Sequence, residues 1–105
     1  MKIQINTDRN ISEDKRMDDY FKKSIEDSLK HFSEHITRIE VHFSDENANK
    51  QEPNDKRCLI EARLKGKQPT AVVGKGNTLE SAFSSAIEKI TALLKTATGH
   101  LKDHH

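Results

Sequence analysis

Hydrophobic residues recur at every second position in three short stretches of this chain, a pattern typical of strands that bury one face. These stretches are residues 2–8, 36–44 and 56–66. A fourth candidate strand, TAVVGKG at residues 70–76, follows a turn that ends at Pro69. The last three stretches follow one another along the chain with only loops between them. They therefore predict a three-stranded antiparallel meander.

Two longer stretches have a helical period instead. In the first, residues 12–32, apolar side chains recur at intervals of four or three: Met17, Phe21, Ile25, Leu29 and Phe32. Ser12 is expected to cap this helix, with Glu13 and Asp14 in the first turn, where the helix dipole favours anions.

The second helical stretch, residues 79–98, has a broader apolar face. Thr78 precedes it as an expected N-cap, and Gly99 follows it as an expected stop. The apolar face consists of Leu79, Phe83, Ala86, Ile87, Ile90, Leu93, Leu94 and Ala97. A stripe of this width predicts a helix that packs on a sheet.

Two amphipathic helices and one sheet, each with a face to cover, predict an α+β fold in two layers. The expected order is β-α-β-β-β-α, with a four-stranded sheet and both helices on one of its faces. A chain of 105 residues with 32% hydrophobic content supports a single domain over residues 1–105, in which residues 99–105 form a frayed tail. The predicted core consists of Met17, Phe21, Ile25, Leu29, Ile39, Val41, Phe43, Ile60, Leu64, Phe83, Ile87, Ile90 and Leu94.

Charge is distributed unevenly along the chain, although the formal net charge is only +1. Residues 56–67 oppose five cations to one anion, whereas the preceding residues 44–55 are acidic. A basic segment attracts phosphate over a Debye length of about 8 Å even in a neutral protein. If residues 56–66 form a strand, its cations are expected to form one exposed row. The cations of this segment are Lys56, Arg57, Arg63, Lys65 and Lys67.

Three residues of this row are candidate phosphate ligands. Arg57, Arg63 and Lys65 are expected on the strand face opposite the core, and an arginine can donate two hydrogen bonds to one phosphate. The alternative is a solvated sheet face that has no partner, since antiparallel sheets often expose one polar face. Glu40 and Glu61 would then neutralise part of the row.

The first helix offers a second candidate surface. Arg16, Lys23 and Lys30 are spaced by seven residues and therefore lie along one outward stripe, which could follow a phosphate backbone. The alternative is again solvation, because three acid–lysine pairs at i,i+4 have the order that stabilises a helix in water. These pairs are Asp18 with Lys22, Asp19 with Lys23 and Glu26 with Lys30.

Nothing in the sequence indicates catalysis, a cofactor or a small-molecule substrate. There is no Gly-rich phosphate loop and no carboxylate pair in an acid–base setting. Cys58 alternates with core residues, as a small buried hydrophobe does. His100 and His104 are one helical turn apart, but no third ligand is arranged beside them, so no metal site is predicted.

Features that the sequence lacks bear on where the protein is located in the cell and on how it could bind a nucleic acid. A single cysteine, no apolar signal region and no apolar run of membrane-spanning length predict a cytoplasmic protein without membrane contact. Four of the five aromatic residues fall on or beside apolar faces, which disfavours stacking on single-stranded bases.

Four segments carry a further pattern: QINTDRNI, HFSEHITRIEVHFSDEN, NDKRCLIEARLKGKQPTAVV and TLESAFSSAIEKITALL. Together they resemble the ribosome hibernation promoting factor family, also known as ribosome-associated inhibitors or sigma-54 modulation proteins. The resemblance implies a fold similar to double-stranded RNA-binding domains. It also implies binding to the small ribosomal subunit where mRNA and tRNA would lie, which blocks translation in resting cells. The weakly charged helices suggest a divergent branch, and the length suggests a short form without the second, dimerising domain.

The family's basic helix positions carry over to Lys22, Lys23, Lys30, Lys89 and Lys95. With the hairpin residues, the full predicted set of RNA-binding residues is Lys22, Lys23, Lys30, Arg57, Arg63, Lys65, Lys89 and Lys95. The expected partner is the rRNA of the small ribosomal subunit. The alternative is a regulatory module of the same fold that binds a protein and not RNA, through the acidic residues 45–55 or the edge of the hairpin.

Overall fold

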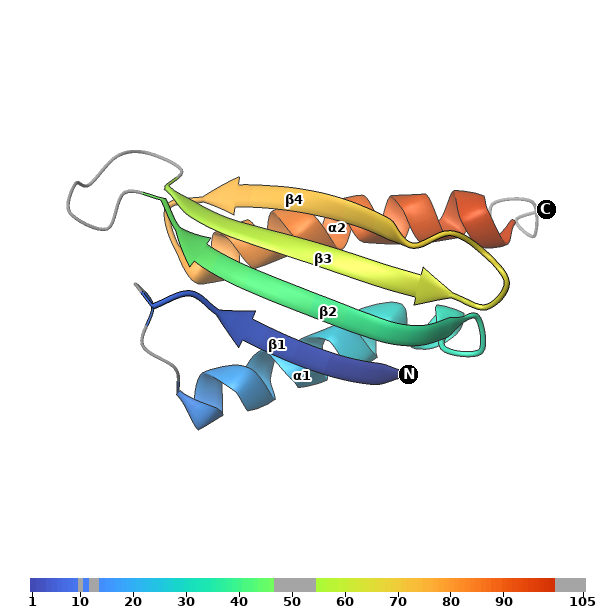
Figure 1. Ribbon diagram of the computed structural model, residues 1–105, viewed down its shortest axis with the longest axis horizontal. Helices are drawn as coiled ribbons and strands as arrows, with labels where there is room; N and C mark the ends of the chain where they lie inside the picture. Colours follow the sequence, from blue (N-terminus) through green and yellow to red (C-terminus); the bar gives the residue numbers. More distant parts are fainter. Residues whose placement is uncertain (10, 12–13, 47–54, 100–105) are drawn as a thin grey trace.

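The elements follow the predicted order β-α-β-β-β-α in the computed structural model, which describes residues 1–9, 11, 14–46 and 55–99 (Figure 1). A short 3-10 helix, η1, extends the first α-helix. The bounds are β1 Lys2–Thr7, α1 Lys15–Leu29, η1 Lys30–Phe32, β2 Ile36–Asp45, β3 Lys56–Leu64, β4 Thr70–Gly76 and α2 Leu79–Thr98.

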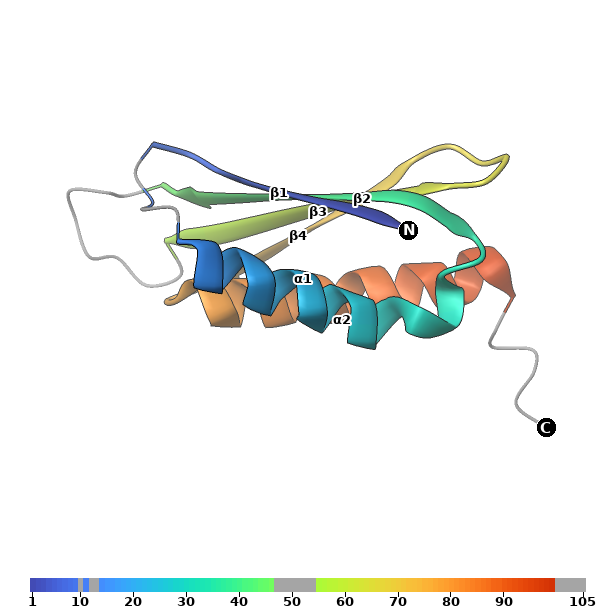
Figure 2. The same cartoon turned by 90° about the horizontal axis from the view of Figure 1, so that it is seen from below.

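The four strands form one sheet in the order β1-β2-β3-β4. Strand β1 runs parallel to β2, while β2, β3 and β4 form the predicted antiparallel meander. Both helices cover the same face of the sheet and leave the other face open, as Figure 2 shows. The two-layer α+β prediction is therefore confirmed.

Helix α1 begins later than the sequence predicts. Asp14 is its N-cap and not a first-turn residue, because its backbone is extended and its side chain accepts a hydrogen bond from the Arg16 N–H at 2.8 Å. Aspartate caps a helix as well as serine does, so the choice between neighbouring caps depends on where the chain leaves β1. The predicted cap Ser12 lies outside the described residues. The predicted helix is also divided, because α1 ends at Leu29 and η1 completes the stretch.

Helix α2 has the predicted ends. Thr78 forms a capping box with Ser81, and Gly99 ends the helix in the left-handed conformation at φ 78°. The predicted apolar face of this helix is wrong at one position, because Leu93 is 41% exposed. Leu93 follows Lys89 by one turn, and Lys89 bonds the edge strand β4 through the carbonyl of Val73, so this flank of the helix lies past the sheet.

The core lies between the helices and the sheet and is centred on three aromatic rings. The ring of Phe21 is 4.7 Å from those of both Phe43 and Phe83, measured between centroids. All predicted core residues are buried except Met17 and Ile87, which are only partly buried against the cluster.

Ile36 belongs to the core although the period of two places it on the wrong face of β2. The pairing of β2 with β3 shifts register between Ile36 and Arg38, so Thr37 is an extra residue at this point. A bulge of this kind lets Ile36 and Ile39 both point inward despite their odd spacing. The hydroxyl of Thr37 donates to the carbonyl of Arg63 at 3.1 Å, so this backbone acceptor of β3 has a hydrogen-bond partner at the bulge.

The two helices run in the same direction. Each begins near the end of the sheet where β1, β2 and β4 end, and each finishes near the end where β2 and β4 begin (Figures 1 and 2). The described part of the molecule therefore has two distinct ends. One combines both helix N-termini with the end of β2 and the start of β3, and the other combines the helix C-termini with the β3–β4 turn.

Candidate nucleic-acid interface

The open face of the sheet carries the predicted arginines, but acids oppose them. Arg63 lies 3.5 Å from Glu61 on the same strand, and the neighbouring Arg38 lies 3.6 Å from Glu40. Glu40 and Glu61 are direct cross-strand partners, and like charges in this arrangement repel unless cations neutralise them. The two arginines therefore serve the sheet itself, and their charge is only partly available to a ligand.

The cations of residues 56–67 do not form the single exposed row that the sequence predicts. Lys56 lies on the helix side of the sheet, where its ammonium group is 3.2 Å from Asp45 and 3.0 Å from Asp55. The hydrogen bond to Asp55, followed by that to Asp45, raises the pKa of Lys56 above its ordinary value. Arg57 is half-buried and lies 3.7 Å from Glu46. The basic strand and the acidic segment before it thus partly neutralise each other.

The open face has no aromatic residue to stack on bases. All five aromatic side chains lie within the described residues. Tyr20 is on α1, and the other four are buried in the core: Phe21, Phe32, Phe43 and Phe83. Single-strand binding proteins depend on such stacking platforms. The face is therefore suited to phosphate contacts and not to reading unpaired bases.

The lysines of α1 are exposed, and the acid–lysine pairs expected from the sequence are not formed. Among the described residues, Arg16 with Asp14 is the one ion pair within α1 and its cap, at 3.9 Å. Lys22, Lys23 and Lys30 therefore keep their ammonium groups in solvent. This removes the main argument for reading these lysines as a self-neutralised helix surface.

Two other lysines hold the layers together. Lys89 on α2 donates to the carbonyl oxygen of Val73 on the edge strand β4 at 2.8 Å. Lys67 in the β3–β4 turn donates to the carbonyl oxygen of Ala97 in the last turn of α2 at 2.7 Å. Both bonds satisfy backbone acceptors that strand or helix pairing leaves unused. The predicted contact Lys89 thus has a structural role.

Seven cations of the described residues lie at the end of the molecule where the helices finish. We define the basic end by the residues Lys2, Lys30, Arg38, Arg63, Lys65, Lys67 and Lys95. The Lys65 N–H donates to the carbonyl of His35 at 2.9 Å, which joins the β3–β4 turn to the turn before β2. The Lys67 bond joins the same turn to α2. Glu34 is the acid within these turns.

Half of the predicted RNA-binding residues lie at the basic end, and the other half lie elsewhere. Lys30, Arg63, Lys65 and Lys95 lie here, whereas the other four predicted contacts lie in the middle of the helix layer or at the opposite end. Lys2, Arg38 and Lys67 were not among the predicted contacts. The spacing of residues along the sequence does not predict that these three cations lie together, because β1, β2 and the hairpin are brought to this end by the sheet topology.

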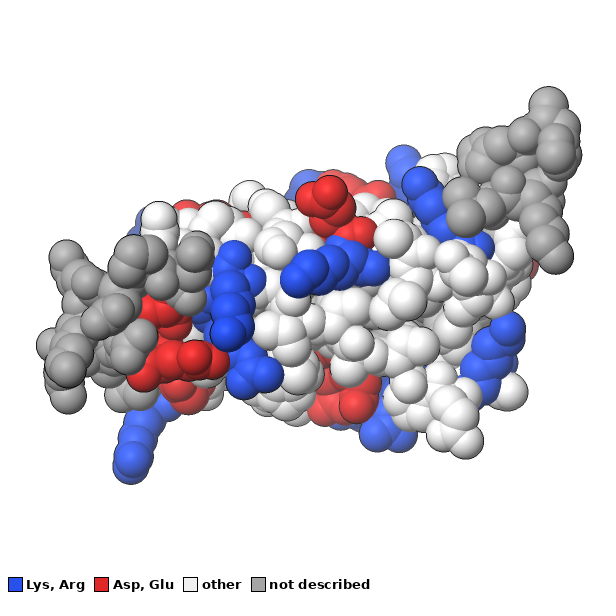
Figure 3. Space-filling view, turned by 90° about the horizontal axis from the view of Figure 1, so that it is seen from above, with Lys and Arg blue, Asp and Glu red and all other residues white. Residues whose placement is uncertain are grey.

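The opposite end carries both acids and cations. Figure 3 views the side formed by β4 and α2, where acidic side chains cluster at the left-hand end beside several basic side chains, and separate basic and acidic side chains appear elsewhere on a largely uncharged surface. The acidic residues of this end include Asp14, Asp45, Glu46, Asp55 and Glu80. Cations of the same end accompany them: Arg9, Lys15, Arg16, Lys56, Arg57 and Lys75. Among the described residues, an excess of cations is therefore found at the basic end, whereas the opposite end has mixed charge.

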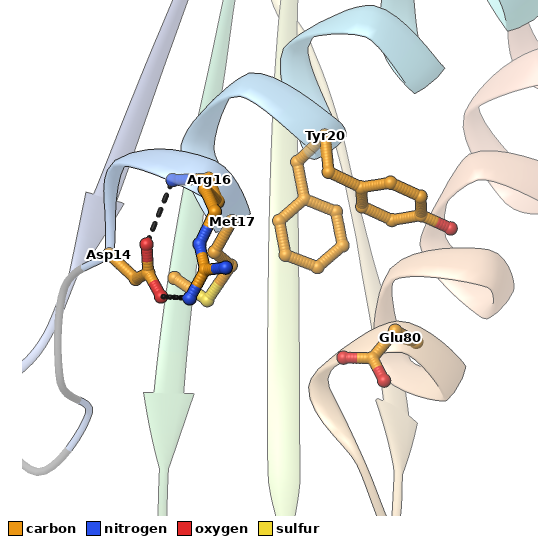
Figure 4. A pocket seen from close by; sticks show the side chains of 6 residues that line it. Asp14, Arg16, Met17, Tyr20 and Glu80 are labelled. Carbon is orange, nitrogen blue, oxygen red and sulfur yellow. Dashed lines mark hydrogen bonds and ion pairs between the residues drawn. The ribbon is translucent and has the colours of Figure 1, made fainter.

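A pocket of about 510 Å³ opens between the first turns of the two helices. Its lining combines an apolar floor with charged groups at the rim (Figure 4): Asp14, Arg16, Met17, Tyr20, Phe21 and Glu80. Tyr20 is 57% exposed, which is unusual for an aromatic residue. Exposed tyrosines of this kind are enriched in protein interfaces.

Other chemistry has little support among the described residues. No group of three or more His, Cys, Asp or Glu side chains lies close enough there to hold a metal ion. Cys58 is buried as predicted, and this burial raises the pKa of its thiol to about 12, which suppresses the reactive thiolate. His100 and His104, for which the sequence predicts no metal site, lie outside the described residues.

None of the described helices combines the length and the apolar character needed to span a lipid bilayer.

The fold is shared with two solved structures. The Protein Y N-terminal domain of Thermus thermophilus is 18% identical, and the match covers 91% of this chain and 98% of that chain with a TM-score of 0.72. A ribosomal subunit interface protein from Coxiella burnetii is 15% identical, and the match covers 94% of this chain and 99% of that chain with a TM-score of 0.73. No curated protein matches the chain in sequence.

The sequence itself matches a family described as sigma 54 modulation protein / S30EA ribosomal protein. The match covers residues 3–102 and so includes both helices and all four strands except Lys2, the first residue of β1. The resemblance stated from the four sequence segments is thereby confirmed, and the chain belongs to the sigma-54 modulation protein / S30EA ribosomal protein family.

Proposed function

We propose that this protein is a ribosome-associated translation inhibitor, a hibernation factor that binds rRNA of the small ribosomal subunit in the cytoplasm. Binding uses basic surface residues that contact phosphates and recognise the folded shape of the RNA. The candidate contacts are Lys22, Lys23, Lys30, Arg57, Arg63, Lys65, Lys89 and Lys95. Occupation of the subunit then excludes the other ligands of translation, without a catalytic step.

The observation that carries this proposal is the solvent exposure of the helix lysines. Lys22, Lys23 and Lys30 have acids one turn away, yet their ammonium groups remain in solvent. An unpaired ammonium group exchanges only water and counterions when it meets a phosphate, so no internal ion pair has to break first. Family membership supplies the ribosome as the polyanionic partner.

A protein-binding module is the second candidate, and the pocket beside Tyr20 favours it. An exposed aromatic ring above an apolar floor offers a docking point for a side chain of a partner protein. In this case the basic residues would serve solubility, and binding to ribosomal subunits would be absent.

Co-sedimentation with purified small ribosomal subunits tests the proposal. The parent protein should travel with the subunits at low salt and should be released by added salt or by heparin, because phosphate contacts depend steeply on ionic strength. Addition of the protein should also reduce translation in a reconstituted system. Failure of the parent protein to bind at low salt would favour the protein-binding module.

A pair of charge-reversed variants shows whether the candidate residues are responsible. The first variant combines Lys23→Glu, Lys30→Glu and Lys95→Glu within the predicted set. The control variant makes the same change in net charge at exposed cations outside the set: Arg9→Glu, Lys15→Glu and Lys75→Glu. Loss of binding in the first variant and its retention in the control supports the proposal. Equal retention in both contradicts the role of the predicted residues.

A further inference from the structure

We propose that the basic end of the molecule contributes more to rRNA affinity than the middle of the helix layer does. The inference rests on the proposed function and ranks the parts of its contact surface. It adds Lys2, Arg38 and Lys67 to the contacts expected from the sequence. It assigns Lys22, Lys23 and Lys89 a smaller share of the affinity.

The distribution of charge is the first argument. The basic end brings together cations from β1, β2, β3, the β3–β4 turn, η1 and α2, whereas the described residues of the opposite end carry acids and cations together. A protein with an excess of cations at one end turns that end toward a polyanion during approach, because the potential of several charges acts together over a Debye length of about 8 Å.

The middle of α1 lacks such a potential. Lys22 and Lys23 are free of ion pairs with the described residues, but four acids lie within one turn of them, so this stretch of α1 has no excess of positive charge. The nearby acids are Asp18, Asp19, Glu26 and Asp27. On α2, Lys89 directly follows Glu88. A phosphate at this surface would meet as many negative as positive groups.

Rigid support is the second argument. The β3–β4 turn, which carries Lys65 and Lys67, is tied to the turn before β2 by the Lys65–His35 backbone bond and to α2 by the Lys67–Ala97 bond. Cations on a turn fixed at two points lose less conformational freedom on binding than cations on a free loop. The basic end is therefore a prepared surface.

Two matched triple variants test the assignment. The end variant combines Lys65→Glu, Lys67→Glu and Lys95→Glu, and the middle variant combines Lys22→Glu, Lys23→Glu and Lys89→Glu. Both change the net charge equally, and each removes one lysine that bonds a backbone carbonyl, so structural loss is balanced. Circular dichroism checks that both variants fold. Affinity for small ribosomal subunits is then measured across a series of salt concentrations.

The end variant should bind more than about tenfold more weakly than the parent, and its slope of log affinity against log salt should fall by roughly two to three units. The middle variant should stay within about threefold of the parent, with an unchanged slope. Equal losses in both variants, or a greater loss in the middle variant, would overturn the assignment while leaving rRNA binding intact. Absence of binding by the parent protein would instead contradict the proposed function itself.

If either triple variant fails to fold, Lys65→Gln with Lys95→Gln replaces the end variant and Lys22→Gln with Lys23→Gln replaces the middle one. None of these four side chains bonds a backbone carbonyl in the structure. A larger loss of affinity and slope in the Lys65/Lys95 pair supports the basic end. An equal or smaller loss overturns it.

Discussion

Gly74 lies where strand β4 approaches the backbone of α2 closely. A Cβ atom at this position would lie 2.3 Å from the carbonyl oxygen of Ala82 and 2.4 Å from the backbone nitrogen of Ala86. Both obstacles are helix backbone, which cannot rotate away as a side chain could. A glycine inside a strand often marks the close approach of another backbone, and Gly74 lets the helix lie against β4.

We expect Gly74→Ala to lower the free energy of unfolding by about 1–3 kcal/mol or more, because the helix must move away from β4. Gly66→Ala is the matched control. Gly66 has a positive φ of 69° but nothing within 4 Å of a new Cβ atom, so only backbone strain of about 1 kcal/mol is expected. Urea denaturation of both variants compares the two costs. A greater loss at Gly66 would contradict the close approach of α2.

Cys58 makes a second residue-scale prediction, because burial raises the pKa of its thiol from 9.0 to about 12. The unfolded chain ionises this thiol at lower pH than the folded chain. The stabilising effect is therefore complete below pH 9 and is lost as the pH rises toward 12. It should amount to a loss of about 1 kcal/mol between pH 8 and pH 10.

Denaturation of the parent protein and of Cys58→Ala across this pH range measures the effect. The parent should lose stability more steeply than the variant, since only the parent carries the thiol. A thiol reagent such as Ellman's reagent should also leave the native parent unmodified at pH 8 and react after unfolding. Parallel pH profiles for the two proteins, or rapid modification of the native parent, would show that the thiol is not buried.

At the scale of elements, helix α2 depends on the ends that its sequence specifies. The side chain of Thr78 accepts from the Ser81 N–H at 3.0 Å, and Ser81 in turn accepts from the Thr78 N–H at 3.1 Å. Loss of a capping side chain leaves first-turn donors without partners. The cap also fixes the point where the chain turns from β4 into the helix.

Thr78→Ala should therefore cost about 1 kcal/mol of the free energy of unfolding. Thr96→Ala is the control on the same helix, because its exposed hydroxyl only bonds back to the carbonyl of Ala92 at 3.3 Å. That substitution should stay within about 0.5 kcal/mol of the parent, since alanine is the better helix former. Thermal or urea unfolding of both variants gives the comparison, and a control cost equal to that of Thr78→Ala would argue against a specific capping role.

Periodicity predicted the elements and most of the core because burial repeats along a strand or helix. It failed where the chain departs from a regular period: at the bulge beside Thr37, which carries Ile36 into the core, and at the flank of α2 that leaves Leu93 exposed. The position of the N-cap at Asp14 also depends on the path of the chain after β1, which the local sequence pattern does not determine.

At the scale of the whole molecule, the candidate site could be predicted only in part. The basic residues themselves are visible in the sequence, but their grouping depends on which ends of the strands and helices coincide. Lys2 and Lys95 are at opposite ends of the chain and lie at the same end of the fold. The sequence also suggested ion pairs along α1 that the structure does not form among the described residues.

Replacing an acid by a lysine tests whether the position of a positive charge, and not only the net charge, controls the affinity for ribosomal subunits. Glu34 is the acid within the turns of the basic end, so Glu34→Lys should strengthen binding to small ribosomal subunits several-fold at low salt and steepen its salt dependence by roughly one unit. Glu26→Lys makes the same change in net charge in the middle of α1 and should have a smaller effect. Equal gains in sedimentation assays would mean that net charge alone, and not its position, controls affinity.

The shared direction of the two helices has an evolutionary consequence. Both helices finish at the basic end, where their last carbonyl groups bear partial negative charge. The positive potential there cannot come from the backbone and must reside on long, exposed side chains. Such side chains can be exchanged without disturbing the core. A lineage could therefore raise or lower its affinity for a polyanion one surface residue at a time, while the architecture behind that surface stays constant.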